Sequence, residues 1–377
     1  MSGGVDQTEQ YEIRPYRQDD RQEYLALFED QWNPIGPEWF EWRFENPYIE
    51  EKAITVAEHD GRIVGARPCI VFPLRSGDHS TLALQPAGTI VHPDHRGRGI
   101  YTRLAKQQIQ YYTEREPTLF FNFPNEAVLH GAKKLGWTEV GRVAAYYRIS
   151  PEAVIEEVGL NPEAITAKVA STAVRTLTRG ATAIGRSLVG DDSDVSVSRH
   201  DSILTDLLVS LYETSVPDEI HVPRDQRFYG WRYDAPRRDA ESTAPTYETY
   251  VARWRGKPVA AAVTCTVTLG GETKTYVFET QPMDTERTPG IGGIVAAIAS
   301  DHRDSDWIKS ARSSMPQTVA AANGFVPDTV PVLSRKADSR TMVVRSLCDD
   351  GEQPIPGRPI TAMDSWRLTL CECEPTV

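Results

Sequence analysis

The run from residue 88 to residue 104 constrains the fold more than any other stretch of the chain. A segment rich in β-forming residues ends at Val91, and Pro93 then breaks the strand. Gly97 and Gly99 give the backbone freedom and place no side chain between the main chain and a ligand. Apolar residues recur after them at helical spacing, so the run predicts a strand, a turn and a helix. Such a turn presents unpaired N–H groups at a helix N-terminus, which suit an anion such as phosphate.

Two familiar phosphate loops do not fit the run. A Walker loop would require Gly-Lys-Ser/Thr where the chain has Gly99-Ile100-Tyr101, and the dinucleotide fingerprint would require a glycine at Thr102. The remaining pattern, Arg-x-x-Gly-x-x after Val-His-Pro, resembles the acyl-CoA pyrophosphate loop of the GCN5-related N-acetyltransferases, the GNAT family. Arg96 and Gly99 match its Gln/Arg-x-x-Gly-x-Gly/Ala pattern, whereas Tyr101 stands where a small residue is expected. The alternative is an ordinary surface turn.

The order of predicted elements around the turn is also that of the GNAT family, over the span from about residue 11 to residue 149. Alternation, periodicity and turn residues predict these elements in turn. They are a strand at 11–16, a helix at 18–31, a hairpin at 54–66 continued by a strand at 69–74, a strand at 81–91, a helix at 100–114, a buried strand at 118–123, a helix at 125–135 and the last strands at 140–148.

A second segment, from Asn125 to Trp137, resembles the family's Asn-x-x-Ala-x-x-Leu-Tyr-x-Lys-x-Gly-Phe helix. Asn125 and the ending Lys-Leu-Gly-Trp match it. In the family, the asparagine contacts the pantetheine arm of the cofactor, and the tyrosine often protonates the departing thiolate. Here the tyrosine position is Ala132, so this chain either uses another acid or departs from the usual chemistry. Asn125 can also serve as a helix N-cap after Pro124.

The resemblance implies a set of cofactor-binding residues. A splayed strand would offer main-chain N–H to the thioester carbonyl, and the amides of residues 96–101 would hold the pyrophosphate. The residues are Ile90, Val91, Arg96, Gly97, Arg98, Gly99, Ile100, Tyr101 and Asn125.

The catalytic acid and base stay unassigned. Family members often carry a glutamate on the strand before the loop, but residues 82–91 contain no acid, and neither Gln85 nor Thr89 is a strong base. Candidates close in sequence are His92, Glu126, His130, Tyr146 and Tyr147. For each of them, a role as a solvated or core residue competes with a catalytic one. A water chain could also remove the proton.

The sequence after about residue 195 repeats features of the first part of the chain. Three residues of the first part recur with similar sequence neighbours in the second part. Trp42 recurs as Trp231 at an offset of 189, Val56 as Val251 at an offset of 195, and Gly136 as Gly324 at an offset of 188. Echoes in the same order at nearly one offset indicate a duplicated domain. In the second copy, Arg287 to Gly292 fits the loop pattern, but Pro289 has no N–H to aim at a phosphate and Ser313 stands at the Asn125 counterpart. The second copy is therefore predicted to be degenerate.

These observations predict an α+β (α/β) fold of two tandem GNAT-type domains. Each would have a mixed, mostly antiparallel central sheet flanked by helices. The predicted boundaries are 9–150 for the cofactor-binding domain, 151–195 for a helical linker and 196–377 for the degenerate second domain. The linker segment carries aliphatic residues along one side and basic residues elsewhere, so an amphipathic helix lying on a membrane or partner is the alternative.

Composition excludes several classes of protein. The chain has 377 residues and a net charge of −12, which disfavours a general nucleic-acid binder. No stretch has the apolar length of a membrane span, and the polar N-terminus does not resemble a signal peptide, so a cytoplasmic protein is expected. The five scattered cysteines imply neither a disulfide framework nor a metal site, and Cys371-Glu372-Cys373 reads as part of a terminal strand.

The predicted function is an acetyl-CoA-dependent N-acyltransferase, in which an amine attacks the thioester directly. The acceptor would be a small-molecule or protein amine, and the aromatic residues from Trp32 to Phe44 would line its site or pack in the core. No metal, no nucleic acid and no membrane span are expected, and the sequence leaves the oligomeric state open. One alternative is an aminoacyl transferase of the paired-domain kind that draws on charged tRNA. The other is a non-catalytic acyl-CoA sensor or scaffold.

Overall fold

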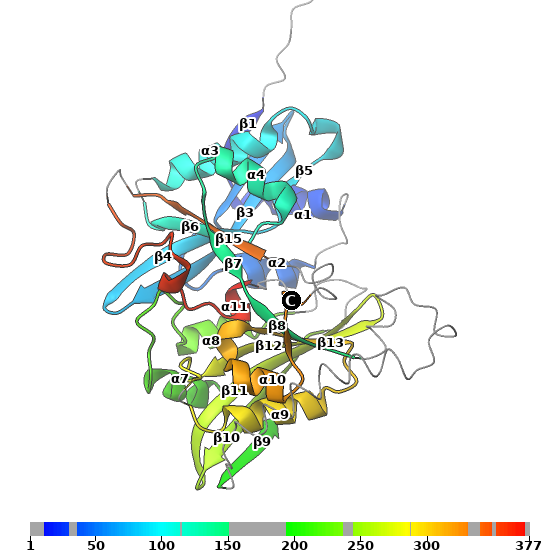
Figure 1. The fold of residues 1–377 in the computed structure, drawn as a ribbon. Coiled ribbons are helices and arrows are strands. Elements are labelled where there is room, and N and C mark those ends of the chain that lie inside the picture. The colour runs from blue at the N-terminus through cyan, green and yellow to red at the C-terminus, as the bar shows by residue number, and fades with distance from the viewer. Residues whose placement is uncertain are drawn as a thin grey trace, which may run out of the picture.

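The structure, a computed structural model, describes residues 11–29, 36–113, 115–150, 194–236, 244–286, 288–330, 340–348 and 352–373. These residues form two mixed, mostly antiparallel sheets with helices packed on them (Figure 1). The predicted fold class is confirmed. The predicted linker at 151–195 lies almost wholly outside the described residues.

The first half of the chain follows the predicted order of elements, except that a helix, α2 (Pro37–Phe44), stands where no element was predicted. Its strands and helices are β1 (Glu12–Pro15), α1 (Arg21–Glu29), α2 (Pro37–Phe44), β2 (Ile54–His59), β3 (Arg62–Ser76), β4 (His79–Pro86), β5 (Ile90–Val91), α3 (Ile100–Tyr112), β6 (Leu119–Asn122), α4 (Glu126–Lys134), β7 (Thr138–Val143) and β8 (Ala145–Ile149). Neighbouring residues of β2 point to opposite faces of the sheet. Val56 packs in the cluster of α1 and α2, whereas Ala57 packs in the cluster of α3.

The second half repeats the sequence of strands and helices. It contains β9 (Val195–His200), α7 (Thr205–Glu213), α8 (Gln226–Arg232), β10 (Thr246–Trp254), β11 (Lys257–Leu269), β12 (Glu272–Gln281), α9 (Ile291–Asp301), β13 (Trp307–Ala311), α10 (Gln317–Ala322), β14 (Val326–Pro327), β15 (Arg340–Ser346) and α11 (Leu370–Cys373). The echo found in the sequence is structural, because Trp42 lies on α2 and Trp231 on the equivalent α8.

The two sheets have the same strand order, and each takes one strand from the other half. The first sheet runs β1-β2-β3-β4-β6-β15-β7, and the second runs β9-β10-β11-β12-β13-β8-β14. In both, the fourth and fifth strands are parallel and the other neighbours are antiparallel. The sixth position is filled by β15 from the second half and by β8 from the first. Figure 1 shows β15, in orange, among the strands of the upper sheet.

This exchange means that the sheets do not divide at residue 150, where the predicted first domain ends. β8 hydrogen-bonds to β13 and β14 in the second sheet, although it follows β7 after a single residue. β15 lies between β6 and β7 of the first sheet. Each half therefore completes the hydrogen-bond ladder of the other.

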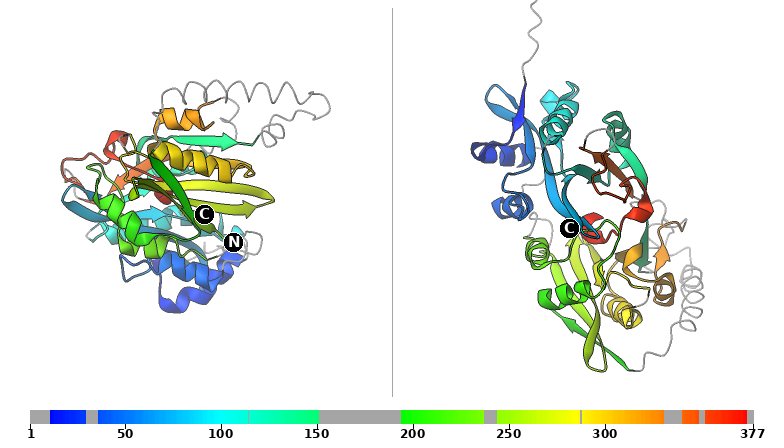
Figure 2. Two further views of the ribbon diagram at one scale, coloured as in Figure 1. Left: turned by 90° about the horizontal axis from the view of Figure 1, so that it is seen from below. Right: turned by 90° about the vertical axis from the view of Figure 1, so that its left-hand side faces the viewer.

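A common core joins the halves. One hydrophobic cluster includes Phe72 and Phe121 of the first sheet together with Phe228 of α8, Phe278 of β12 and Trp366. The helix α11, red in Figure 2, lies at the junction, where the side-chain amide of Gln85 donates to the backbone oxygen of Glu372 at 2.9 Å. The predicted terminal strand at residues 371–373 was wrong, because these residues form this short buried helix.

The duplicated tryptophans meet across the junction. The indole N–H of Trp42 donates to the backbone oxygen of Trp231 at 2.8 Å. The indole N–H of Trp231 donates in return to the backbone oxygen of Trp42 at 2.9 Å. The two rings stack with centroids 6.4 Å apart. A contact in which each partner makes the same bond to the other is the signature of a two-fold relation, here within a single chain.

Candidate functional site

The strand that leads into the glycine-rich turn is interrupted by a bulge. Pro86 of β4 pairs with Cys69 of β3, and Ile90 of β5 pairs with Ala66. Three residues, 87–89, therefore face only two residues of β3, which is the geometry of a β-bulge. The sequence predicted one continuous strand over 81–91, and the interruption arises where Gly88 takes a φ of +83°.

The sheet opens beside this bulge. β6 pairs with β4 only at Leu119–Ala83 and Phe120–Leu84, and β6 then continues to Asn122 along β15 alone. The two parallel strands therefore separate as they approach the bulge. A separation of this kind gives a ligand access to main-chain groups in the middle of the sheet.

The turn itself is open to solvent. Gly99 is the N-cap of α3 with a φ of +73°, and Gly97 has a φ of +76°. A Cβ added to either glycine would meet no atom within 4 Å. The turn therefore combines a left-handed backbone, which glycine tolerates, with free space in front of the first amides of a helix.

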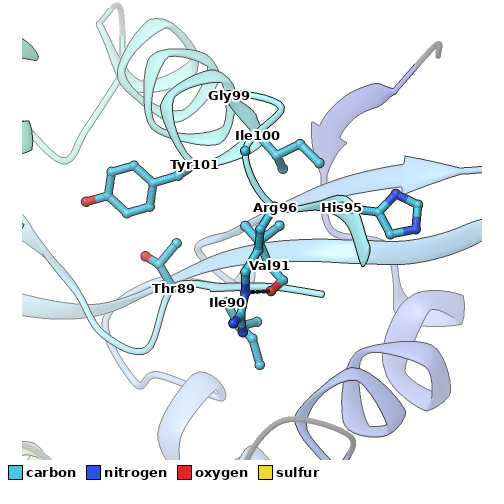
Figure 3. A pocket seen from close by; sticks show the side chains of 9 residues that line it. Thr89, Ile90, Val91, His95, Arg96, Gly99, Ile100 and Tyr101 are labelled. Carbon is cyan, nitrogen blue, oxygen red and sulfur yellow. Dashed lines mark hydrogen bonds between the residues drawn. The ribbon is translucent and has the colours of Figure 1, made fainter. Parts of the chain in front are cut away.

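A hollow of about 290 Å³ lies between the bulge and the turn (Figure 3). It is lined by Thr89, Ile90, Val91, His95, Arg96, Gly97, Gly99, Ile100 and Tyr101. Seven of the nine predicted cofactor-binding residues are among them. In Figure 3, Tyr101 and Thr89 lie at one side of the hollow and Arg96 at the other, with the Nε–H of Arg96 donating to the backbone oxygen of Val91 at 3.0 Å.

The other two predicted residues lie outside the lining of the hollow. Arg98 donates to the hydroxyl of Tyr11 at 2.7 Å. Asn125 is the N-cap of α4, and its side-chain oxygen accepts the N–H of Val128 at 3.1 Å. The capping role that the sequence offered as the alternative for Asn125 is thus present, and contact with a cofactor stays a prediction.

Basic and aromatic side chains surround the outer end of the turn. The Nδ1 atom of His95 lies 3.0 Å from the hydroxyl of Tyr11, and its ring has His59 and His92 as neighbours. Burial, reinforced by these two histidines, lowers the pKa of His95. Arg103 donates to the backbone oxygen of Tyr11 at 2.7 Å. The positive charges favour an anion at the turn.

The candidate catalytic residues do not converge on the hollow. Tyr146 and Tyr147 belong to β8 in the second sheet, where Tyr146 packs in the core of that sheet and Tyr147 lies against Trp307. His130 is exposed on α4, and His92 accepts the N–H of Asp94 at 3.4 Å. The side chain of Glu126 lies outside the described part of the structure. The catalytic acid and base therefore stay unassigned.

Ala132 is buried in a hydrophobic cluster that also contains Phe120, Trp137 and Val343. The position that carries a tyrosine in the family pattern thus holds no group able to give up a proton. The sequence interpretation also passed over Arg67, which is buried behind Thr89 and Tyr101. A single arginine within the apolar run of β3 is the signal that could have identified it.

The equivalent turn of the second half is closed. Gly290 is the N-cap of α9 with a φ of +84°, so the backbone repeats that of Gly99. A Cβ at Gly290, however, would lie 2.6 Å from the Cβ of Ala252 and 3.4 Å from a methyl group of Val195. Strands β9 and β10 fill the space that is open in the first half. Arg287 lies outside the described residues.

Comparison with protein-family models finds a match in the first half of the chain. Residues 12–140, about a third of the chain, match the family model of the acetyltransferase (GNAT) domain. These residues are therefore similar to a GNAT domain. No curated protein matches the chain in sequence. Within the described residues, no three histidine, cysteine or acidic side chains gather as a metal site would require, and none of the helices there is long and apolar enough to cross a membrane.

Solved structures share the fold of the chain across both halves. A GCN5-related N-acetyltransferase from Anabaena variabilis ATCC 29413 aligns with a TM-score of 0.57 and 11% identity, over 90% of this chain and 73% of that one. A probable N-acyltransferase from Enterococcus faecalis V583 aligns with a TM-score of 0.57 and 10% identity, over 90% of this chain and 72% of that one. The N-myristoyltransferase of Saccharomyces cerevisiae, solved with myristoyl-CoA, aligns with a TM-score of 0.54 and 10% identity, over 92% of this chain and 81% of that one. The chain therefore shares its fold with these three proteins.

Proposed function

We propose that the chain transfers an acyl group, in the first instance acetyl, from acyl-CoA to the nitrogen of an amine. The observation that carries the proposal is the hollow between the β-bulge at residues 87–89 and the open turn before α3. It joins an anion-binding helix N-terminus to a gap in the sheet where a thioester can reach main-chain N–H groups.

The residues of the turn fit the diphosphate of coenzyme A. Gly97 and Gly99 leave space in front of the amides, so two phosphates could approach the backbone closely. Arg96 stands at the rim of the hollow, and Arg98 and Arg103 lie behind it. The pantetheine arm would then run past Tyr101 toward the bulge, and Asn125 would meet it from the start of α4.

Acyl transfer in this arrangement needs no covalent enzyme intermediate. The protein would hold the amine against the thioester carbonyl, which converts a bimolecular step into a nearly unimolecular one. Main-chain N–H groups at residues 89–91 would stabilise the negative charge that develops on the carbonyl oxygen. The proton that the amine loses would pass to solvent or to a base brought by the acceptor complex.

The first half supplies the site, and the second half would support it. The closed turn at Gly290 argues against a second cofactor site. The aromatic residues Trp39, Phe40 and Phe44 pack in the core, which favours core packing over a place at the acceptor site, and Trp32 lies outside the described residues. We propose the cytoplasm as the compartment, because none of the five cysteines forms a disulfide.

Calorimetry with acetyl-CoA tests the proposal first, followed by a thiol-release assay over a panel of amines. A second panel of acyl-CoA thioesters with longer chains separates acetyl transfer from transfer of other acyl groups. We expect saturable binding with a stoichiometry of one per chain and release of free thiol only in the presence of an amine. A chain that binds no coenzyme A contradicts the proposal.

The two alternative functions give different results in these assays and in a titration with RNA. Binding without turnover on any amine would identify a non-catalytic acyl-CoA sensor, a function consistent with Ala132 at the tyrosine position. Binding of RNA that weakens steeply with salt would instead identify a transferase that draws on charged tRNA. The net charge of −12 disfavours this second alternative.

A further inference from the structure

A buried cation lies directly behind the wall of the hollow. Arg67 of β3 is only 4% exposed. Its Nη1 atom donates to the hydroxyl oxygen of Thr89 at 3.2 Å, and its guanidinium carbon lies 5.7 Å from the centroid of the Tyr101 ring. Thr89 and Tyr101 both line the hollow. The charge of Arg67 therefore acts on the hollow through two of its lining side chains.

No carboxylate of the described residues pairs with Arg67. Its remaining side-chain bond runs from Nε to the side-chain oxygen of Gln108 at 3.0 Å. Gln108 is fully buried, also accepts the thiol of Cys69 at 3.3 Å, and donates to the backbone oxygen of Arg67 at 3.0 Å. Burial raises the pKa of Cys69 to about 12, so this thiol stays neutral at physiological pH. The amide thus holds the guanidinium in place without cancelling its charge.

A buried charge without a counter-ion is unfavourable, so it is retained where the charge has a task. Guanidinium does not release its proton in proteins, and Arg67 therefore cannot act as an acid itself. Its effect must pass through a neighbour, and of the two neighbours that line the hollow, Thr89 is the one whose hydroxyl accepts a hydrogen bond from Arg67.

The hydroxyl of Thr89 is set up as a hydrogen-bond donor. Its oxygen accepts from Arg67, and a hydroxyl that accepts one bond still has its own proton to give. The described residues provide no acceptor for that proton. In Figure 3 the hydroxyl of Thr89 lies on the side of the hollow toward Tyr101. A hydroxyl polarised by a cation is a stronger donor than an isolated hydroxyl.

We propose that Thr89 is a catalytic donor of the acyl transfer and that Arg67 is its positioning residue, together taking over the task of the tyrosine that Ala132 replaces. The inference rests on the proposed function. In the step, the amine nitrogen bonds to the carbonyl carbon, the carbon–sulfur bond breaks, and its electron pair goes to the sulfur. Thr89 donates a hydrogen bond to that thiolate. The amine releases one proton to solvent, and the thiolate later takes one from solvent.

The experiment compares three substitutions in the full chain. Thr89→Val removes the hydroxyl at nearly constant volume, and Thr89→Ser keeps it. Thr118→Val is the matched control, because the hydroxyl of Thr118 also bonds another side chain, Thr81 at 2.7 Å, and Thr118 does not line the hollow. We expect Thr89→Val to lower kcat about 100-fold, the usual cost of losing one donor to a developing negative charge. Thr89→Ser and Thr118→Val should stay within about threefold of wild type, and the Kd of acetyl-CoA should change little in all three.

A second readout does not depend on turnover. The thiol of bound coenzyme A can be titrated through the ultraviolet absorbance of its thiolate. A donor aimed at the sulfur lowers the pKa of this thiol, so Thr89→Val and Arg67→Gln should both raise it above the wild-type value, whereas Thr118→Val should not. A purely structural role of Thr89 would leave this pKa unchanged.

The results separate this inference from the proposed function. If the wild-type chain binds coenzyme A and turns over, and Thr89→Val keeps the wild-type rate or the wild-type thiol pKa, the inference is overturned and the proposed function stands. Failure of the wild-type chain to bind coenzyme A overturns both. If Arg67→Gln does not fold, the contrast between Thr89→Val and Thr89→Ser decides the question without it.

Discussion

The junction between the two halves contains a buried histidine that should make the stability of the whole chain depend on pH. His221 is 1% exposed, and its backbone exchanges two hydrogen bonds with Arg75 of β3. Its Nδ1 atom lies 2.7 Å from the backbone oxygen of Glu219, and its Nε2 atom lies 2.8 Å from the hydroxyl of Tyr212. A neutral ring that donates through Nδ1 and accepts at Nε2 satisfies both contacts.

The protonated ring is disfavoured in the folded chain. Burial is the main cause, and it lowers the pKa of His221 to about 4. Arg224 and Arg75 act in the same direction as burial, whereas Glu372 and the bond to the Glu219 oxygen oppose it. In the unfolded chain the pKa returns to about 6.5.

The sign of the pH effect follows from these two values. Below about pH 6.5 the unfolded chain binds a proton that folded His221 does not bind, so the free energy of unfolding falls as the pH falls. The contribution of His221 is complete above that pH and is lost progressively down to about pH 4. The loss amounts to about 2 kcal/mol between pH 7 and pH 5 and to about 3 kcal/mol by pH 4.

Urea unfolding of wild type and His221→Gln, measured at matched pH values, isolates this contribution. Other groups titrate equally in both proteins, so the difference between the two free energies of unfolding reports His221 alone. We expect wild type to lose about 2 kcal/mol relative to the variant between about pH 7 and pH 5. A difference that stays constant over this range would refute the reasoning.

Two further predictions concern the same junction. Trp231→Ala should lower the free energy of unfolding in urea by about 3 kcal/mol, because it removes the stacked ring and the reciprocal bond to Trp42. The control Trp254→Ala, at an indole that is 43% exposed, should lower it by less than about 1 kcal/mol. Equal losses in the two variants would contradict the reciprocal contact. Arg224→Met should cost about 3–5 kcal/mol, because the two carboxylates that Arg224 contacts are buried and would lose their cation. A loss below about 1 kcal/mol would count against that explanation.

The turn could be predicted from sequence because its signals are local. Glycines that need positive φ, a proline after a strand and helical periodicity all act within a few residues. The duplication could be predicted for a related reason, since Trp42 and Trp231 sit in similar neighbourhoods of sequence. That the two rings then contact one another follows from the two-fold packing of the halves, which no offset reveals.

The exchange of β8 and β15 could not be predicted. Each segment has the composition of a strand, but the identity of a strand's partner depends on tertiary packing rather than on its own residues. The same limit applies to Arg67, whose importance comes from its bond to Thr89, a residue 22 positions away. The short helix α11 was read as a strand because two buried cysteines around Glu372 mimic alternation.

The central claim is that the turn before α3 holds the diphosphate of an acyl-CoA. Gly99→Asp places a carboxylate in the open space in front of the turn, and Gly256→Asp is a close control. Gly256 has a φ of +78°, close to the +73° of Gly99, and a Cβ at either position meets nothing within 4 Å.

Calorimetry with acetyl-CoA on these two variants is the most direct test. Because the backbone cost of the two substitutions is similar, a difference in binding reports on the turn itself. The account predicts wild-type affinity for Gly256→Asp and no measurable binding for Gly99→Asp. Retention of affinity in Gly99→Asp would contradict it.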